Sequence, residues 1–467
     1  MKARQTMTPK QRSSPGMGRF GAALFCLLIC LGAVVPAVRA QSGSQLTLAI
    51  TGTKKISLAL PDFTTPQGGN QALNMQQIFH KTLWNDLYQS GLVVMISPSL
   101  YPAGNPGQPS DLNAASLQSW ASPPSEAQRL VFGNVVVVNG VLQIEGYLYD
   151  VTQPASPFVL GKRYTDQPSP AAAEMMAHEF ANAIVAALGG GVGIATTKIA
   201  YISNRTGHKE VWLMDYDGQN KRQITHLHSI CYSPRISPNG HRIAFISYAS
   251  GTPEIWIYSL ISNRYVRFPR WRGFIATPAW SPDGKKLAFS ADLHHTGYPE
   301  IYTVHADGYG LKQLTFSRSV NIAPVWNPKT GAQIAFESDR SGLPQIYTMD
   351  ADGTNQQVLT TGGYAVSPAW SPNGQLLAFS WRRTGGGEGN GGAYDIYLMD
   401  LATRNYIQLT HNGQRNDFPS WAPDGRHVVF TSGRPGHWQL FTMLADGSSP
   451  AELTSRGSNQ MPNWSQK

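Results

Sequence analysis

Residues 332–374 read AQIAFESDRSGLPQIYTMDADGTNQQVLTTGGYAVSPAWSPNG. This stretch holds three short apolar runs and then a Pro-Ala-Trp-Ser-Pro-Asn-Gly segment. An Asp/Ser/Gly turn separates the first two runs, and an Asp-Gly turn separates the second from the third. Strand-length runs bounded by such residues are typical of β-strands joined by tight turns. The stretch therefore predicts four consecutive short strands.

The same order of pieces recurs until the chain ends. Six copies at intervals of 43 to 51 residues match the length of a four-stranded propeller blade, whereas helical repeats would show a 3.6-residue period. The aromatic residue of the first run falls at Tyr201, Phe245, Phe289, Phe336, Phe379 and Phe430, and that of the second at Trp212, Trp256, Tyr302, Tyr347, Tyr397 and Phe441. We therefore predict an all-β, six-bladed β-propeller.

The phase of the copies predicts how the ring closes. The tryptophan-like position falls at Ile236, Trp280, Trp326, Trp370, Trp421 and Trp464. Only three residues follow Trp464, whereas Tyr201 has no such segment before it. We expect Asn463 to Ser465 to pair with the first propeller strand, Ile199 to Ser203, because this pairing removes an open sheet edge.

Charge and hydropathy mark the N-terminus as a targeting segment. Six of the 37 Lys and Arg residues precede residue 41, where there is no acidic residue, so the remaining chain carries 31 against 28, a net of +3. This balance and the lack of a basic stripe argue against nucleic-acid binding. The basic start, the apolar run from Phe20 to Val35 and Val38-Arg39-Ala40 predict a signal peptide over 1–40 that is cleaved after Ala40. An uncleaved anchor is the alternative, although 16 apolar residues fall short of the roughly 20 that span a membrane.

Residues 41–188 have a different pattern. Leu46, Leu48 and Ile50 alternate within an N-terminal extension, 41–55, which is either an edge strand or a segment that docks on a partner. We then expect a strand, a helix with Ile78, Leu83, Leu87 and Tyr88 on one side, a parallel strand, a weak helix near Ser116 to Trp120, and a hairpin turning at Asn139-Gly140. A further strand over Phe158 to Tyr164 precedes a helix over Pro170 to Leu188, with core positions at Met175, Met176, Phe180, Ile184 and Leu188. We therefore expect an α/β domain over 56–188, a glycine-rich linker over 189–198 and the propeller over 199–467.

Strand alternation assigns the propeller loops to two faces. Turns such as Ser281–Gly284 and Asp350–Gly353 share one face and are nearly identical between copies. The loops on the other face vary, as in Arg267 to Ile275, Arg318 to Ile322, the insertion Gly385 to Gly392, Arg415 to Phe418 and Ser458 to Met461. Variation favours a binding face, with unconstrained drift as the alternative.

Motifs for catalysis and metal binding are missing from the sequence. No Gly-x-Ser-x-Gly nucleophile turn, His-Glu-x-x-His zinc motif or phosphate-binding glycine loop occurs. Asp215–Gly218 and Asp350–Gly353 begin like calcium loops but lack the acidic ligand at the twelfth position, and turn geometry explains them. After cleavage of the signal only Cys231 remains, so no disulfide can form within the chain. We expect no catalytic residues, no cofactor and no metal.

PAWSPDGKKLAFSAD (Pro278 to Asp292), PQIYTMDADG (Pro344 to Gly353) and ISLALPDF (Ile56 to Phe63) together resemble the TolB family of Gram-negative periplasmic proteins. The resemblance implies a monomeric, non-enzymatic adaptor of the Tol-Pal envelope system, with roles in outer-membrane integrity, cell division and protein import. It implies binding of the lipoprotein Pal over the propeller mouth, and binding of TolA through the N-terminal segment that contains Leu46, Leu48 and Ile50. Phe268-Pro-Arg-Trp271 resembles a family loop at the Pal face.

The partner-binding residues that we predict lie in the variable loops, where arginines and aromatic residues serve as anchors. They are Arg270, Trp271, Arg272, Arg318, Asn321, Tyr364, Arg415, Asn416 and Phe418. A peptidase-associated propeller and a cell-wall carbohydrate-binding module remain as alternative functions.

Overall fold

The structure is a computed structural model that describes residues 55–382, 393–411, 414–434 and 436–467. The predicted signal peptide with its cleavage site at Ala40, the segment containing Leu46, Leu48 and Ile50, and most of the glycine-rich insertion Gly385 to Gly392 lie outside these residues. Among the described helices, none is both long and apolar enough to cross a membrane.

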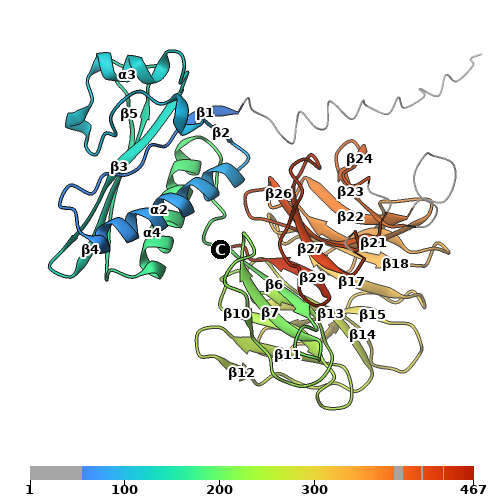
Figure 1. Cartoon of the computed structure of the whole chain (residues 1–467). Coiled ribbons are helices and arrows are strands. Elements are labelled where there is room, and N and C mark those ends of the chain that lie inside the picture. Colours follow the sequence, from blue (N-terminus) through green and yellow to red (C-terminus); the bar gives the residue numbers. More distant parts are fainter. Residues whose placement is uncertain (1–54, 383–392, 412–413, 435) are drawn as a thin grey trace, which may run out of the picture. The chain divides into compact units, whose positions relative to one another are not determined.

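An α/β region comes first in the described chain (Figure 1). Its sheet has the order β2-β1-β3-β4-β5, with β1 parallel to β2 and β3, and with β3, β4 and β5 antiparallel. The elements are β1 (Ile56–Ala59), α2 (Asn70–Gln89), β2 (Val93–Met95), η1 (Pro98–Leu100), η2 (Pro109–Asp111), α3 (Ala114–Ala121), β3 (Arg129–Val138), β4 (Val141–Asp150), β5 (Phe158–Asp166) and α4 (Pro170–Ala187). The predicted order of strands and helices is confirmed.

Local sequence explains these elements. Ser169 caps α4 by accepting a hydrogen bond from the backbone N–H of Ala172, and Pro170 occupies the first turn, where no N–H is needed. Asn139 and Gly140 both have positive φ angles, 51° and 75°, so the β3–β4 hairpin turns as predicted.

Two predicted core positions are wrong. Tyr88 on α2 is 67% exposed and Met175 on α4 is 44% exposed. Tyr88 follows the buried Leu87, and Met175 precedes the buried Met176. Neighbouring residues on a helix point about 100° apart. Only one residue of each pair can therefore face the sheet.

Six four-stranded antiparallel sheets make up the described part of the propeller. The first three sheets contain β29 (Asn459–Trp464), β6 (Lys198–Ser203), β7 (Glu210–Asp215) and β8 (Arg222–Gln223); β9 (Cys231–Ile236), β10 (Arg242–Ser247), β11 (Glu254–Ser259) and β12 (Arg264–Val266); β13 (Phe274–Trp280), β14 (Lys286–Asp292), β15 (Glu300–His305) and β16 (Lys312–Gln313). The other three contain β17 (Asn321–Trp326), β18 (Gln333–Ser338), β19 (Gln345–Asp350) and β20 (Gln357–Val358); β21 (Tyr364–Trp370), β22 (Leu376–Arg382), β23 (Asp395–Asp400) and β24 (Tyr406–Gln408); β25 (Asn416–Trp421), β26 (His427–Ser432), β27 (Gln439–Leu444) and β28 (Ala451–Glu452).

The ring closes as predicted. The last strand, β29, pairs antiparallel with β6, with Asn459 opposite Ser203 and Trp464 opposite Ile199 (Figure 1). The pairing begins four residues earlier than expected, because a bulge between Gln460 and Asn463 hides the strand's alternation in the sequence.

The same bulge occurs in the first strand of every blade. Each of these strands contains one non-glycine residue with a left-handed backbone, at φ angles between 48° and 55°, where the register shifts. The six bulge residues are Ser233, Thr277, Ala323, Ser367, Phe418 and Met461.

Candidate functional site

Two cavities lie along the innermost strands of the propeller. The first, which we call the loop-side cavity, has a volume of about 350 Å³ and is lined by all six bulge residues. The second, the Trp-side cavity, has a volume of about 930 Å³ and is lined by all six residues at the tryptophan-like position. The bulge residue precedes the tryptophan-like residue by three positions in each strand, so the two cavities follow one another along the strands.

Two of the nine predicted partner-binding residues line the loop-side cavity. Phe418 is the bulge residue of β25 and is partly buried. Arg415 lies just before this strand, and its Nη2 donates a hydrogen bond of 2.9 Å to Oδ2 of Asp417. Half of the Arg415 side chain is exposed, so it can contact a partner and hold a buried carboxylate at the same time.

A third predicted residue, Tyr364, is connected to Arg415 by a series of cation–π contacts in which guanidinium groups and aromatic rings alternate. The Arg382 guanidinium carbon lies 4.0 Å from the ring centre of Tyr364 and 5.6 Å from that of Tyr394. The Arg415 guanidinium carbon lies 4.8 Å from the Tyr394 ring and 5.7 Å from the Trp438 ring. We call these five residues the arginine–aromatic ladder. Cation–π contacts of this kind hold large side chains in place before a partner arrives.

The other exposed predicted residues lie outside the lining of the loop-side cavity. Arg270 pairs with Glu254 at 3.2 Å, and its side chain is 62% exposed. The Trp271 ring stacks on Phe289 at 5.3 Å and packs against a hydrophobic cluster. Two further predicted residues are exposed: Arg272 and Arg318.

Asn321 and Asn416 require a correction, because both side chains are fully buried. The Asn321 amide donates to Oε2 of Glu300 at 2.7 Å, and the Asn416 amide donates to Oδ1 of Asp395 at 3.1 Å. Asn459 makes the equivalent bond to Gln439 in a third blade. A contact that repeats from blade to blade is structural, so we remove Asn321 and Asn416 from the proposed contact set.

Sequence reasoning missed a buried pair of carboxyl groups in the loop-side cavity. Oε1 of Glu337 accepts a hydrogen bond of 2.6 Å from the Ser367 backbone N–H, and the Ser367 hydroxyl donates to Oδ1 of Asp417 at 2.9 Å. Burial raises the pKa of Glu337 to about 8, the Ser367 N–H opposes this shift, and the charge on Asp417 adds to it. Glu337 is therefore protonated at neutral pH.

A signal for Glu337 was present in the repeat. Glu337 directly follows the aromatic residue of its strand, where every other copy has an aliphatic or hydroxyl side chain. The equivalent residues are Ile202, Ile246, Ser290, Ser380 and Thr431. A carboxyl group at a buried strand position is costly unless it has partners or a function, so it could have been singled out.

The loop-side cavity combines aromatic rings, the cations of Arg235 and Arg415, and the carboxyl group of Glu337. Within the described residues, no group of three or more His, Cys, Asp or Glu side chains is placed to hold a metal ion.

The described chain is thus a closed six-bladed β-propeller that follows an α/β region, with two cavities along the innermost strands of the propeller. A sequence model described as the TolB beta propeller domain matches residues 185–389 and 362–467. The chain therefore belongs to the TolB β-propeller family.

Curated relatives carry the same family name. The Tol-Pal system protein TolB of Geobacter metallireducens is 35% identical over 217 residues, which cover 46% of this chain and 48% of the relative. The chain thus spans about half the length of the first relatives that it matches. A protein TolB homolog of Chlorobium luteolum is 29% identical over an alignment that covers 96% of this chain and 98% of the relative. The chain is thus a homologue of a Tol-Pal system component.

A solved structure shares the fold. The crystal structure of TolB from Acinetobacter baumannii superposes with a TM-score of 0.75 at 23% identity, and the match covers 89% of this chain and 98% of that one. At this identity the similarity concerns the fold alone.

Proposed function

We propose that the protein is a non-enzymatic periplasmic adaptor of a Tol-Pal system that binds the Pal lipoprotein at the loop-side mouth of its propeller. The names of its relatives support the system. The predicted signal peptide over 1–40 supports the periplasm. In such a system the adaptor would serve outer-membrane integrity and constriction at division.

The observation that carries the site is the arginine–aromatic ladder. Arginine and aromatic side chains supply most binding energy at protein interfaces, and they contribute more when they are already ordered. Arg415 is the exposed member of the ladder, and the partly buried Tyr364 is connected to it through Arg382 and Tyr394. Arg270, Trp271, Arg272, Arg318 and Phe418 complete the proposed contact set.

The proposal extends to TolA, with the segment 41–55 as its contact. Leu46, Leu48 and Ile50 alternate as in a strand that can pair with a partner sheet. A chain that begins at Lys55 should therefore keep Pal binding and lose TolA binding.

Titration of the mature chain, residues 41–467, with a soluble Pal domain from the same organism tests the site. A double variant, Tyr364→Ala with Arg415→Lys, keeps the charge beside Asp417 but removes a ring and a planar cation from the ladder. Loss of two anchors should weaken Pal binding by about 2 kcal/mol or more, which is over tenfold.

Tyr309→Ala is the matched control, since Tyr309 is 78% exposed and lines neither cavity. A double variant that melts like the wild type and binds Pal equally well would refute the site. Failure of the wild-type chain to bind Pal would refute the function, and cleavage of a fluorogenic peptide by the pure protein would favour the peptidase alternative.

A further inference from the structure

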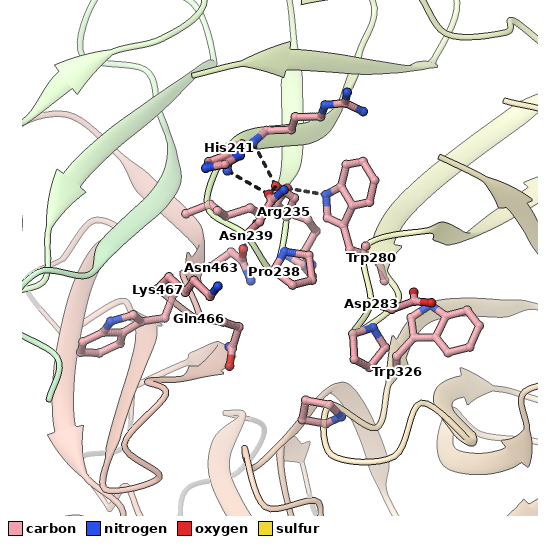
Figure 2. Close-up of a pocket in the computed structure, with 18 of the residues that line it drawn as sticks. Arg235, Pro238, Asn239, His241, Trp280, Asp283, Trp326, Asn463, Gln466 and Lys467 are labelled. Carbon is pink, nitrogen blue, oxygen red and sulfur yellow. Dashed lines mark hydrogen bonds between the residues drawn. The ribbon is translucent and has the colours of Figure 1, made fainter. Parts of the chain in front are cut away.

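The larger of the two cavities has no role in the function proposed above. The Trp-side cavity lies where the innermost strands end and the stereotyped turns begin, and it is lined by Pro238, Pro282 and Pro328 from three of these turns (Figure 2). Its volume of about 930 Å³ falls in the range of sites that enclose a ligand or a short peptide.

Arg235 is the unusual residue of this cavity. It directly precedes the tryptophan-like position of its strand, and the five equivalent residues of the other blades are uncharged: Ala279, Val325, Ala369, Ser420 and Asn463. Arg235 lines both cavities, as do four of these five, so a ring of mostly small or neutral side chains with one cation separates them.

The Arg235 guanidinium has unused donors. Its Nη1 donates to the carbonyl oxygen of the adjacent Pro234 at 3.0 Å, and none of the ion pairs found among the described residues includes Arg235. A guanidinium has five N–H donors and no acceptor. Burial lowers the pKa of Arg235 to about 10, which still leaves it cationic at neutral pH. Arg235 is only partly buried and has no carboxylate partner among the described residues, so its remaining N–H groups can donate to an anion in the cavity.

A second lining residue also has an unused donor. The indole N–H groups of Trp280, Trp370 and Trp421 each donate at 3.1 Å to a backbone carbonyl of the preceding blade. The equivalent N–H of Trp326 is buried and has no hydrogen-bond acceptor among the described residues. At Arg235 and at Trp326 the wall therefore holds donors without an acceptor among the described residues.

The remaining side chains of the wall make it basic. Arg242 and Lys467 line the cavity together with His241, and the only acidic side chain in its described lining is Asp283 (Figure 2). Three side-chain cations against one side-chain carboxylate attract an acidic ligand, and the proline rings and indoles give it apolar surface to contact.

We propose that the Trp-side cavity is a second binding site, whose ligand is an acidic peptide segment of a partner protein with one carboxylate at Arg235. This site is at the opposite end of the innermost strands from the proposed Pal surface and does not depend on it. A short peptide in extended form could bring a carboxylate from the turns to Arg235, whereas a compact domain could not enter a cavity of about 930 Å³.

Fluorescence anisotropy with a labelled peptide of alternating Glu and Pro tests the proposal, in the absence of Pal and at low ionic strength, where screening is weak. The mature chain should bind this peptide and not its Gln-Pro counterpart. Arg235→Met keeps the apolar stem and should weaken binding by about tenfold or more. Arg264→Met, on the exposed strand β12 and outside both cavities, should leave affinity unchanged.

Asp283→Asn provides a variant that should fold without strain. Asn239 and Asn373 occupy the equivalent turn position in other blades, where each accepts a hydrogen bond of 2.7 Å from a serine hydroxyl as Asp283 does at 2.6 Å. Removing this carboxylate should tighten binding of the Glu-Pro peptide by about twofold.

Several outcomes would overturn the site. The first is that the Glu-Pro peptide does not bind at concentrations up to the millimolar range. The second is that the Gln-Pro peptide binds as tightly as the Glu-Pro peptide. The third is that folded Arg235→Met binds the Glu-Pro peptide with the affinity of the wild type. If Arg235→Met does not fold, unchanged or weaker binding in Asp283→Asn overturns it. Full displacement of the peptide by equimolar free glutarate would show a site for small carboxylates instead and would overturn the peptide assignment.

Discussion

Deleting residues 459–467 should open the propeller. The deletion removes β29 and leaves β6 as an unpaired edge in a blade that is assembled from both ends of the domain. It also breaks one contact to the residue before β6 and one to the neighbouring blade, at Ser420 in β25. Trp464 donates its indole N–H to the Thr197 hydroxyl at 2.8 Å and its backbone N–H to the Ser420 hydroxyl at 3.0 Å.

The magnitude follows from burial and hydrogen bonding. Trp464 is 2% exposed, and truncating a buried tryptophan to alanine costs about 3–5 kcal/mol. Each lost buried hydrogen bond adds about 1 kcal/mol, including the bond from the Ser465 backbone N–H to the Lys198 carbonyl and that from the Asn459 amide to Gln439. The sum of about 6–10 kcal/mol is comparable to the whole stability of a typical domain. The truncated propeller should therefore be unfolded or nearly so at room temperature.

Thermal unfolding followed by circular dichroism measures this effect. Trp464→Ala alone is the graded version and should lower the Tm by about 10 °C, while Tyr309→Ala, at an exposed turn, should not change it. A peptide of residues 457–467 added in trans should restore part of the lost signal. A truncated protein that melts at the wild-type temperature would refute the closure argument.

Two further predictions concern buried polar groups. The folded pKa of Glu337, about 8, exceeds its ordinary value of 4.5, so the folded state holds a proton that the unfolded state has lost. Wild-type stability should therefore fall between about pH 4.5 and 8, by up to about 5 kcal/mol, and stay low above pH 8. Glu337→Gln should abolish this loss, so Tm curves of the two proteins that run parallel over this pH range would contradict the assignment. Asn321→Ala should destabilise the protein by about 1–3 kcal/mol, because the buried Glu300 carboxylate loses its 2.7 Å donor, and a urea midpoint equal to that of the wild type would show that the bond is dispensable.

The sequence alone determined the strands that recur from blade to blade. Because each blade buries its own apolar strands, the positions of Phe336 and Tyr347 in one copy indicate the strands of all six. The order of the strands within the copies was enough to match Trp464 with the start of the propeller. The first copy lacks a first strand and the last copy is followed by an extra one, so the two complete one blade. In the α/β region, Asn139-Gly140 located the hairpin by local backbone chemistry, and the spacing of apolar residues such as Phe180 and Ile184 located α4.

Contacts between copies were decided only by the tertiary structure. Asn321 and Asn416 looked like loop residues, yet each is held against the preceding blade by a hydrogen bond to an acid about 21 residues earlier in the chain. Glu337 is brought together with Ser367 and Asp417 from two other blades, and burial in this place, with a smaller contribution from the charge of Asp417, raises its pKa.

Arg235 also has one property that the sequence shows and one that only the tertiary structure shows. Its cationic side chain is visible in the sequence, but its place between two cavities depends on how six blades pack around one axis. A repeat encodes the hydrogen bonds and burial within one blade, because those involve residues near in sequence. Which side chains of different blades meet at the two cavities is set by the packing of segments that are distant in sequence.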